Sequence, residues 1–106
     1  MVPSLSVEQL QEKFTSKENV CLVDVRQDWE YDLCRLPASL HIPLTELEDR
    51  LTEIPPSKTI VVICHHGIRS QQATLRLIKA GLKDVFSLRG GIDAWAKQID
   101  PSIGFY

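Results

Sequence analysis

Short runs of apolar, mostly β-branched residues alternate along this chain with segments rich in helix-forming residues. The apolar runs cover residues 20–25, 60–63 and 85–88. Such runs are typical of strands buried on both faces of a parallel sheet, and parallel strands need long crossover connections, usually helices. The alternation therefore predicts an α/β fold in which right-handed crossovers join a small, largely parallel sheet.

Helix signals occupy the intervals between the apolar runs. Residues 6–9 have the sequence of a capping box, Ser-Val-Glu-Gln, and residues 45–48 have a similar one, Thr-Glu-Leu-Glu. Residues 71–80 are rich in helix formers and are followed by a glycine, which is a common helix stop. Further helical segments are expected at residues 29–32 and 92–99.

Cys64 directly follows the apolar run at residues 60–63, and a short loop separates it from the next predicted helix. The first amides of a helix are unpaired donors and its amino end carries partial positive charge, so a thiolate at this place is stabilised. Arg69 adds a permanent cation, and His65 and His66 add further charge if they are protonated. Cys64 is therefore the candidate nucleophile.

Gly67 lies in the middle of this loop, where it can take backbone conformations closed to other residues and turn successive amides inward. The loop thus predicts a cradle for an anionic group beside a reactive sulfur. In the simplest alternative, Cys64 is only a small buried hydrophobe at a strand end, but that role does not require the glycine, the arginine or the helix start. The candidate substrate-binding residues are His65, His66, Gly67, Ile68, Arg69 and Ser70.

Asp24 and Arg26 stand at the end of the first apolar run. Because sites in open parallel sheets gather at the carboxyl ends of strands, we expect this pair on the same side of the molecule as Cys64. Its expected role is structural support of the surrounding loops, and Arg26 and Glu30 are candidates for an ion pair. Arg69, in contrast, is expected to face solvent and substrate.

At these residues the sequence resembles the single-domain rhodanese-like sulfurtransferase family. Residues 64–70 are similar to the family's active loop, and residues 22–26, Leu-Val-Asp-Val-Arg, are similar to its early Asp-Val-Arg strand. Residues 36–43 resemble its Pro-Gly-Ala and Ile-Pro segment, and residues 90–95 resemble its closing Gly-Gly and Trp signature. The resemblance implies a single rhodanese-like domain over residues 1–106, with a mostly parallel five-stranded sheet flanked by helices on both faces.

The same resemblance implies a chemistry. Cys64 attacks the outer sulfur of thiosulfate or another small anionic sulfur donor and becomes a persulfide, from which a thiol or a sulfur-carrier protein collects the sulfur. The family reaction needs no cofactor. No metal is expected either, because Cys64, His65 and His66 are too close in the chain to direct three ligands at one tetrahedral ion.

The sequence departs from the family's common pattern at three positions. Arg35 stands where a histidine is usual, Ala38 where a glycine is usual, and Gly104 where a proline is often seen. Residues 94–106 otherwise resemble the end of rhodanese domains that are fused to enzymes activating ubiquitin-like proteins. This likeness suggests at most a related partner protein.

Two other functions remain open. Cysteine phosphatases and arsenate reductases have a related loop, but the tyrosine-phosphatase signature places five residues between cysteine and arginine, whereas four separate Cys64 from Arg69 here. The shorter loop is expected to be too tight for a phosphate ester. The other alternative is a non-catalytic or sulfur-carrier module that recognises a protein partner.

Composition and charge exclude several classes of protein. The 106 residues carry a net charge of −2, which gives no general attraction to nucleic acid or to acidic membranes. No apolar run approaches the ~18 residues of a membrane span, and the first residues lack the pattern of a signal peptide. Three cysteines leave one unpaired under any disulfide scheme, which favours a reducing, cytoplasmic setting.

Overall fold

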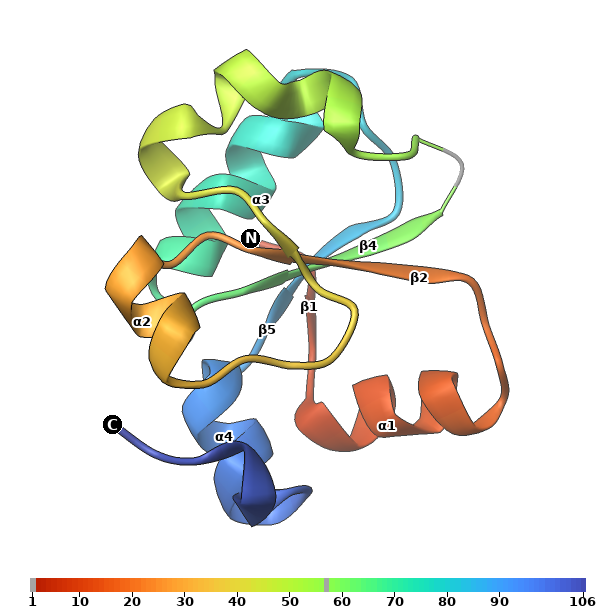
Figure 1. The fold of residues 1–106 in the computed structure, drawn as a ribbon. Helices are drawn as coiled ribbons and strands as arrows, with labels where there is room; N and C mark the ends of the chain where they lie inside the picture. Colours follow the sequence, from red (N-terminus) through yellow and green to blue (C-terminus); the bar gives the residue numbers. More distant parts are fainter. Residues whose placement is uncertain (1, 57) are drawn as a thin grey trace.

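The computed structural model describes residues 2–56 and 58–106, and its centre is a five-stranded sheet (Figure 1). The strands are β1 (Ser4–Leu5), β2 (Val20–Asp24), β3 (Leu40–His41), β4 (Thr59–Ile63) and β5 (Val85–Leu88). They lie in the order β1-β5-β4-β2-β3, and every strand pair within the described residues runs parallel. The predicted α/β fold with a parallel sheet is confirmed.

The central strand β4 pairs with β2, and the apolar residues of both strands are largely buried. In their register Val23 pairs with Val62, and Asp24 pairs with Ile63. The carboxyl ends of the two strands therefore lie side by side, and the amide of Val25 donates to the Ile63 carbonyl oxygen at 3.0 Å. This register brings the charged end of β2 and the residue after β4 to the same edge of the sheet.

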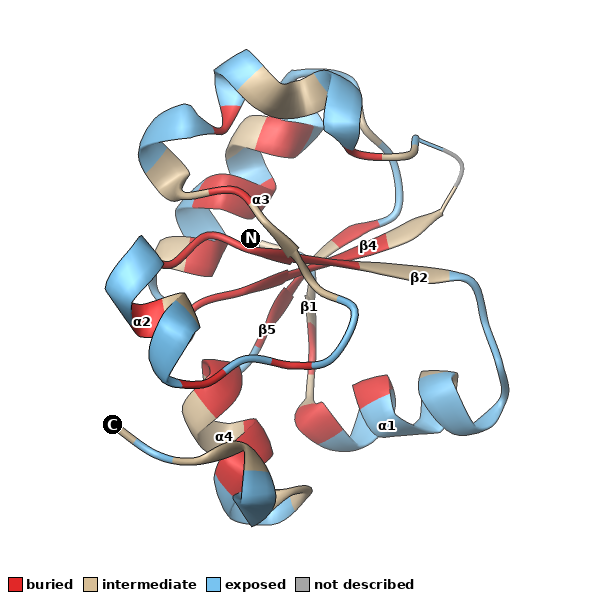
Figure 2. Cartoon of the chain, in the orientation of Figure 1, coloured by how far each residue is buried: buried red, intermediate tan, exposed pale blue. Residues whose placement is uncertain are grey.

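The helices of the described residues are α1 (Val7–Thr15), α2 (Asp28–Leu33), α3 (Arg69–Lys79) and α4 (Gly91–Gln98), with 3-10 helices η1 (Leu44–Glu46), η2 (Glu48–Glu53) and η3 (Pro101–Ile103). They cover both faces of the sheet (Figure 1, Figure 2). On one side α1 and α4 bury a cluster that includes Leu10 and Trp95. On the other, α3, η1 and η2 bury a cluster that includes Val62 and Leu77.

Of the two predicted capping boxes, one is confirmed and the other is wrong. Ser6 Oγ accepts from the amide of Gln9 at 3.1 Å, and Gln9 Oε1 accepts from the amide of Ser6 at 2.8 Å. Thr45, in contrast, lies inside η1 instead of before a helix. The chain already turns at Leu44, whose amide donates to the Val25 carbonyl oxygen at 3.1 Å, so Thr45 has no helix end to cap.

The loop before β3 contains two of the three departures from the family pattern, Arg35 and Ala38. Ala38 has a φ of +60°, which lies in the left-handed region that favours glycine. The alanine therefore bears strain of about 1 to 2 kcal/mol in a conformation that a glycine would adopt freely. Gly104 has a φ of +97°, which a proline ring cannot reach, so the chain also follows its own path near the tail.

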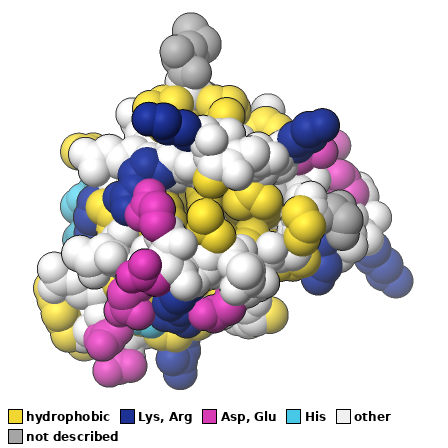
Figure 3. Space-filling model, turned by 90° about the horizontal axis from the view of Figure 1, so that it is seen from above, with side chains coloured by type: hydrophobic (Ala, Val, Ile, Leu, Met, Phe, Trp, Pro, Cys, Tyr) yellow, Lys and Arg dark blue, Asp and Glu magenta, His cyan; other side chains and the backbone are white. Residues whose placement is uncertain are grey.

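The face formed by η1, η2 and α3 carries charged side chains of both signs around a patch of apolar ones (Figure 3). Arg50 donates to Glu53 at 2.8 Å within η2, and Arg76 of α3 donates to Glu48 Oε2 at 2.6 Å. These ion pairs tie η2 to itself and to α3. Within residues 2–56 and 58–106, every helix falls short of the length and apolar character that a bilayer crossing requires.

Candidate active site

Cys64 lies directly after β4 at the carboxyl edge of the sheet, and the residue is 1% exposed. Two loop amides point at its sulfur: the amide of Gly67 donates to Sγ at 3.0 Å, and that of Ser70 donates at 3.3 Å. The Ser70 hydroxyl oxygen lies 3.4 Å from the same atom. A sulfur surrounded by donors is suited to carry negative charge.

The amino end of α4 holds the first residues of this loop. The amides of Ile92 and Asp93 donate to the carbonyl oxygens of Cys64 and His65, at 2.9 and 3.1 Å. Gly91, just before them, has a φ of +61°, and a Cβ at this position would collide with both carbonyl oxygens. A glycine at position 91 therefore lets the helix approach the loop closely enough to bind it.

Other loop amides are available to a ligand. The amides of His65, His66 and Ile68 donate to no acceptor in the part of the chain that the structure describes. Gly67, between them, has a φ of +101°, and a Cβ there would come within 3.1 Å of the Gly90 nitrogen. The glycine lets the chain curl around the sulfur, and the unpaired amides form a cradle suited to an anion.

Arg69, which the sequence predicts to face solvent and substrate, is also paired with a carboxylate. Its side chain is 33% exposed and lines the hollow described below. Its guanidinium donates to both carboxylate oxygens of Glu30, at 2.6 and 2.8 Å. These bonds from Arg69 lower the pKa of Glu30 to about 2, although burial acts in the opposite direction. The cation at the start of α3 is therefore neutralised by α2.

Tyr106 completes this arrangement, and only the resemblance of the tail to fused rhodanese domains drew attention to its segment. Its hydroxyl donates to Glu30 Oε2 at 2.7 Å and accepts from Arg26 Nη1 at 3.1 Å. Burial, together with the bond to Glu30, raises the pKa of Tyr106 to about 12, so the phenol stays a donor at neutral pH. Its ring stacks on His65, with the ring centroids 3.8 Å apart.

The two loop histidines lie ring on ring, with centroids 3.9 Å apart. Burial, and then the neighbouring His66, lower the pKa of His65, which disfavours the charge considered for this ring. His66 Nε2 lies 3.9 Å from Asp93 Oδ2, but Lys97 pairs with that oxygen at 2.9 Å. Donor atoms of His65, His66 and Asp93 lie within 4.8 Å of one another, a spacing at which three such groups could hold a metal ion.

Asp24 and Arg26 form a fully buried ion pair at 2.8 Å. Arg26 also donates to the carbonyl oxygens of Cys34 and Glu30, at 2.5 and 3.2 Å. The expected ion pair between Arg26 and Glu30 is wrong, because Arg26 reaches the backbone of Glu30 while the carboxylate binds Arg69 and Tyr106. The pair thus ties the end of β2 to the middle of α2 and to the residue that follows this helix, and this geometry supports a bracing role.

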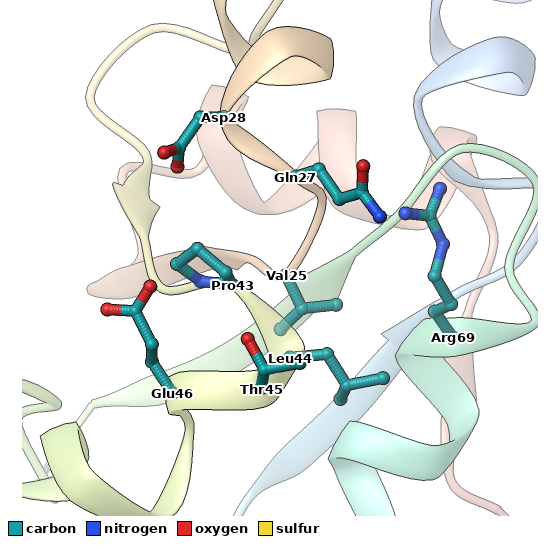
Figure 4. Close-up of a pocket in the computed structure, with 8 residues that line it drawn as sticks. All are labelled: Val25, Gln27, Asp28, Pro43, Leu44, Thr45, Glu46 and Arg69. Atoms are coloured by element: carbon teal, nitrogen blue, oxygen red, sulfur yellow. The ribbon is translucent and has the colours of Figure 1, made fainter.

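A hollow of about 380 Å³ lies beside the loop, and Arg69 forms one of its walls (Figure 4). Val25 contributes an apolar side chain to it, and Asp28 and Glu46 contribute carboxylates. Cys64 packs in the same buried cluster as Val25. Cys64 itself is not among the residues that line the hollow, whose volume is in the usual range for small-molecule sites.

Fold and site together define an α/β protein that presents a buried thiol to a loop of backbone amides at a helix start. The chain belongs to the rhodanese-like domain family, whose model matches residues 6–98. This finding confirms the resemblance drawn from the sequence motifs.

Relatives and solved structures agree with the family. The chain is 37% identical over 98 residues to a sulfurtransferase of Allochromatium vinosum, with 92% of each protein covered. It is also 37% identical over 103 residues to the adenylyltransferase and sulfurtransferase uba4 of Ogataea parapolymorpha, covering 96% of this chain and 25% of that protein. A rhodanese-like domain protein from Staphylococcus aureus superposes with a TM-score of 0.86 at 26% identity, with 99% of each chain covered.

Proposed function

We propose that this chain is a sulfurtransferase that moves sulfane sulfur from a small anionic donor, such as thiosulfate, to a thiophilic acceptor through a persulfide on Cys64. The observation that carries the proposal is the pair of amides, from Gly67 and Ser70, that donate to Cys64 Sγ. Such donors stabilise both the attacking thiolate and the persulfide that it becomes. The relatives named as sulfurtransferases support the reaction type.

The first half-reaction uses only the thiolate and the donor. Cys64 Sγ forms a bond to the outer sulfur of thiosulfate while the sulfur–sulfur bond of thiosulfate breaks, and the electron pair of that bond leaves with sulfite. In the second half-reaction an acceptor thiolate takes the outer sulfur, and the electron pair of the persulfide bond returns to Cys64. The proposed step begins from the thiolate form of Cys64, so no general base takes part in it.

The loop amides are proposed to bind the oxygens of the donor. Those of His65, His66 and Ile68 are unpaired in the described structure and lie in the loop that surrounds the sulfur. Arg69 adds little net charge, since Glu30 neutralises it, and its proposed role is to hold the loop in place. Donor binding therefore rests on amide dipoles more than on a side-chain cation.

A thiol or a sulfur-carrier protein is the proposed acceptor. The relative uba4 combines the names of an adenylyltransferase and a sulfurtransferase in one protein, which supports a carrier partner for the present chain. Trp29 and Ile68 are 57% and 71% exposed and lie near the site, so an apolar surface is available to such a partner. The three free cysteines support a reducing, cytoplasmic setting.

Initial-rate kinetics with thiosulfate and an acceptor thiol test the proposal. A persulfide separates donor and acceptor into two half-reactions, so rate plots at several acceptor concentrations should give parallel lines, and Cys64→Ser should be inactive. Intersecting lines would point to direct transfer in a ternary complex. Hydrolysis of an aryl phosphate that is lost in Cys64→Ser would favour a phosphatase. No turnover with any sulfane donor would favour a non-catalytic or carrier module.

A further inference from the structure

Ser87 has a buried hydroxyl that the reaction described above does not use. The residue lies in β5 between β1 and β4, is 1% exposed, and has its amide bonded to the Pro3 carbonyl oxygen at 2.9 Å. A hydroxyl in such a place is unfavourable unless it is hydrogen-bonded, and the smaller alanine would fit the same space. Its Oγ lies 2.7 Å from the Oγ of Ser70, which is itself fully buried.

This contact extends a chain of hydroxyl groups that ends at the reactive sulfur. Ser70 Oγ lies between Ser87 Oγ, at 2.7 Å, and Cys64 Sγ, at 3.4 Å. Each hydroxyl has one hydrogen to donate, whereas a thiolate can only accept. When the sulfur is charged, Ser70 gives its hydrogen to Sγ, and Ser87 then donates to Ser70. When Cys64 is a neutral thiol, the two bonds can run in the opposite direction.

We propose that Ser87 is a positioning residue for the reaction at Cys64, which it serves by holding the Ser70 hydroxyl with its hydrogen toward the charged sulfur. The inference rests on the proposed role of Cys64 as nucleophile, but its test needs no sulfur donor. The other groups that face or flank this sulfur are the amides of Gly67 and Ser70, the ring of His65, and Arg69 with its partner Glu30.

The test is the rate of Cys64 alkylation by iodoacetamide as a function of pH, measured on the full chain by peptide mass spectrometry. Ser87→Ala should raise the pH midpoint of alkylation by about 0.5 to 1 unit, because one hydrogen bond to the charged form is weakened. Below the midpoint, this shift lowers the alkylation rate by about 3- to 10-fold. Ser87→Thr, which keeps the hydroxyl, should restore most of the wild-type profile.

A double-mutant cycle separates this role from a general effect on packing. Ser70→Ala and the Ser70→Ala/Ser87→Ala double variant should share one midpoint, because Ser87 acts through the Ser70 hydroxyl. Thr74→Val is the matched control: Thr74 is fully buried and its hydroxyl donates to the Ser70 carbonyl oxygen at 2.7 Å, away from the sulfur. This variant should lower the melting temperature and leave the midpoint unchanged.

Three results would overturn the inference. The first is a folded Ser87→Ala variant with the wild-type midpoint of alkylation. The second is a Ser87→Ala shift of the midpoint that is equally large with and without the Ser70 hydroxyl. The third is a shift in Thr74→Val as large as that in Ser87→Ala. If Ser87→Ala does not fold, Ser87→Cys keeps the volume with a weak donor and should show the same upward shift. If sulfur transfer fails but the alkylation results are as expected, the proposed function is rejected and this inference stands.

Discussion

Replacing Glu30 with glutamine tests whether an ion pair between α2 and α3 holds the loop. The Glu30 carboxylate accepts two bonds from Arg69 at 2.6 and 2.8 Å, one from Tyr106 at 2.7 Å and one from the amide of Gln27 at 3.0 Å. A glutamine amide has a single accepting oxygen and places hydrogens where a carboxylate oxygen stood. At least one bond from Arg69 is therefore lost, together with the opposite charge.

The size of the effect follows from the burial of the two partners. A hydrogen bond to a charged group contributes about 1.5 to 3 kcal/mol to the free energy of unfolding. The Arg69 side chain is 33% exposed and Glu30 only 5%, so water recovers part of the loss on the arginine side. We expect Glu30→Gln to lower the free energy of unfolding by about 2 kcal/mol at pH 7.

The dependence of the free energy of unfolding on pH in the acid range gives a second, independent test of this ion pair. The bonds from Arg69 lower the pKa of Glu30 from its ordinary value of 4.5 to about 2. A carboxylate with a lowered pKa stabilises the folded state above its ordinary pKa, and this contribution is lost as pH falls toward the folded value. Wild-type stability should therefore fall between about pH 4.5 and 2 more steeply than that of Glu30→Gln.

Urea unfolding followed by tryptophan fluorescence measures both effects. Glu53→Gln is the matched control, because Glu53 also accepts two bonds from an arginine, Arg50, at 2.8 and 3.0 Å, but lies in an exposed position. Its replacement should change stability far less. Equal stability of Glu30→Gln and wild type at pH 7, with equal slopes in acid, would refute the reasoning.

Three further substitutions test individual features of the loops. Ala38→Gly should raise the free energy of unfolding by up to about 1 kcal/mol, because it relieves a left-handed alanine at some cost in chain entropy, and a loss of stability in urea would contradict this. Gly91→Ala should lower the free energy of unfolding by about 1 to 3 kcal/mol and alter the alkylation rate of Cys64, since the added Cβ collides with the loop. Wild-type values of both quantities would contradict that contact. Tyr106→Phe should cost about 1 to 2 kcal/mol in urea unfolding, because Glu30 and Arg26 lose a hydrogen-bond partner, whereas an unchanged midpoint would show that the hydroxyl is dispensable.

The sequence predicted those parts of the fold whose cause is local. The strands β2, β4 and β5 coincide with apolar runs, because strands that are buried on both faces of a sheet consist mostly of apolar residues. The two-residue strands β1 and β3 have no such signal, since they exist only through pairing with β5 and β2. The wrong prediction of a capping box at Thr45 has a similar cause. A tertiary hydrogen bond from the Leu44 amide to the Val25 carbonyl oxygen starts the turn one residue before Thr45.

The candidate site likewise has a part whose cause is local in the sequence and a part that depends on the tertiary fold. The loop around Cys64 was predicted because a strand, a glycine and a helix start are neighbours in the chain. The partners of its arginine were not, because Glu30 lies 39 positions from Arg69 and 76 from Tyr106, and only the tertiary fold brings them together. The sequence indicated Arg26, four positions away, as a candidate partner for Glu30, but the Arg26 guanidinium pairs with Asp24 in the interior.

The most direct test of the central claim is the intact mass of the protein after treatment with thiosulfate, followed by peptide mapping. We expect one added sulfur atom on Cys64, removable by dithiothreitol, and none in Cys64→Ser. Cys21 is a poor competitor because burial raises the pKa of its thiol. Cys34 is 6% exposed, and within the described residues its Sγ accepts a long contact of 3.8 Å from Arg26 Nη1 instead of bonds from backbone amides. Sulfur found on Cys21 or Cys34, or no added sulfur at all, would contradict the account.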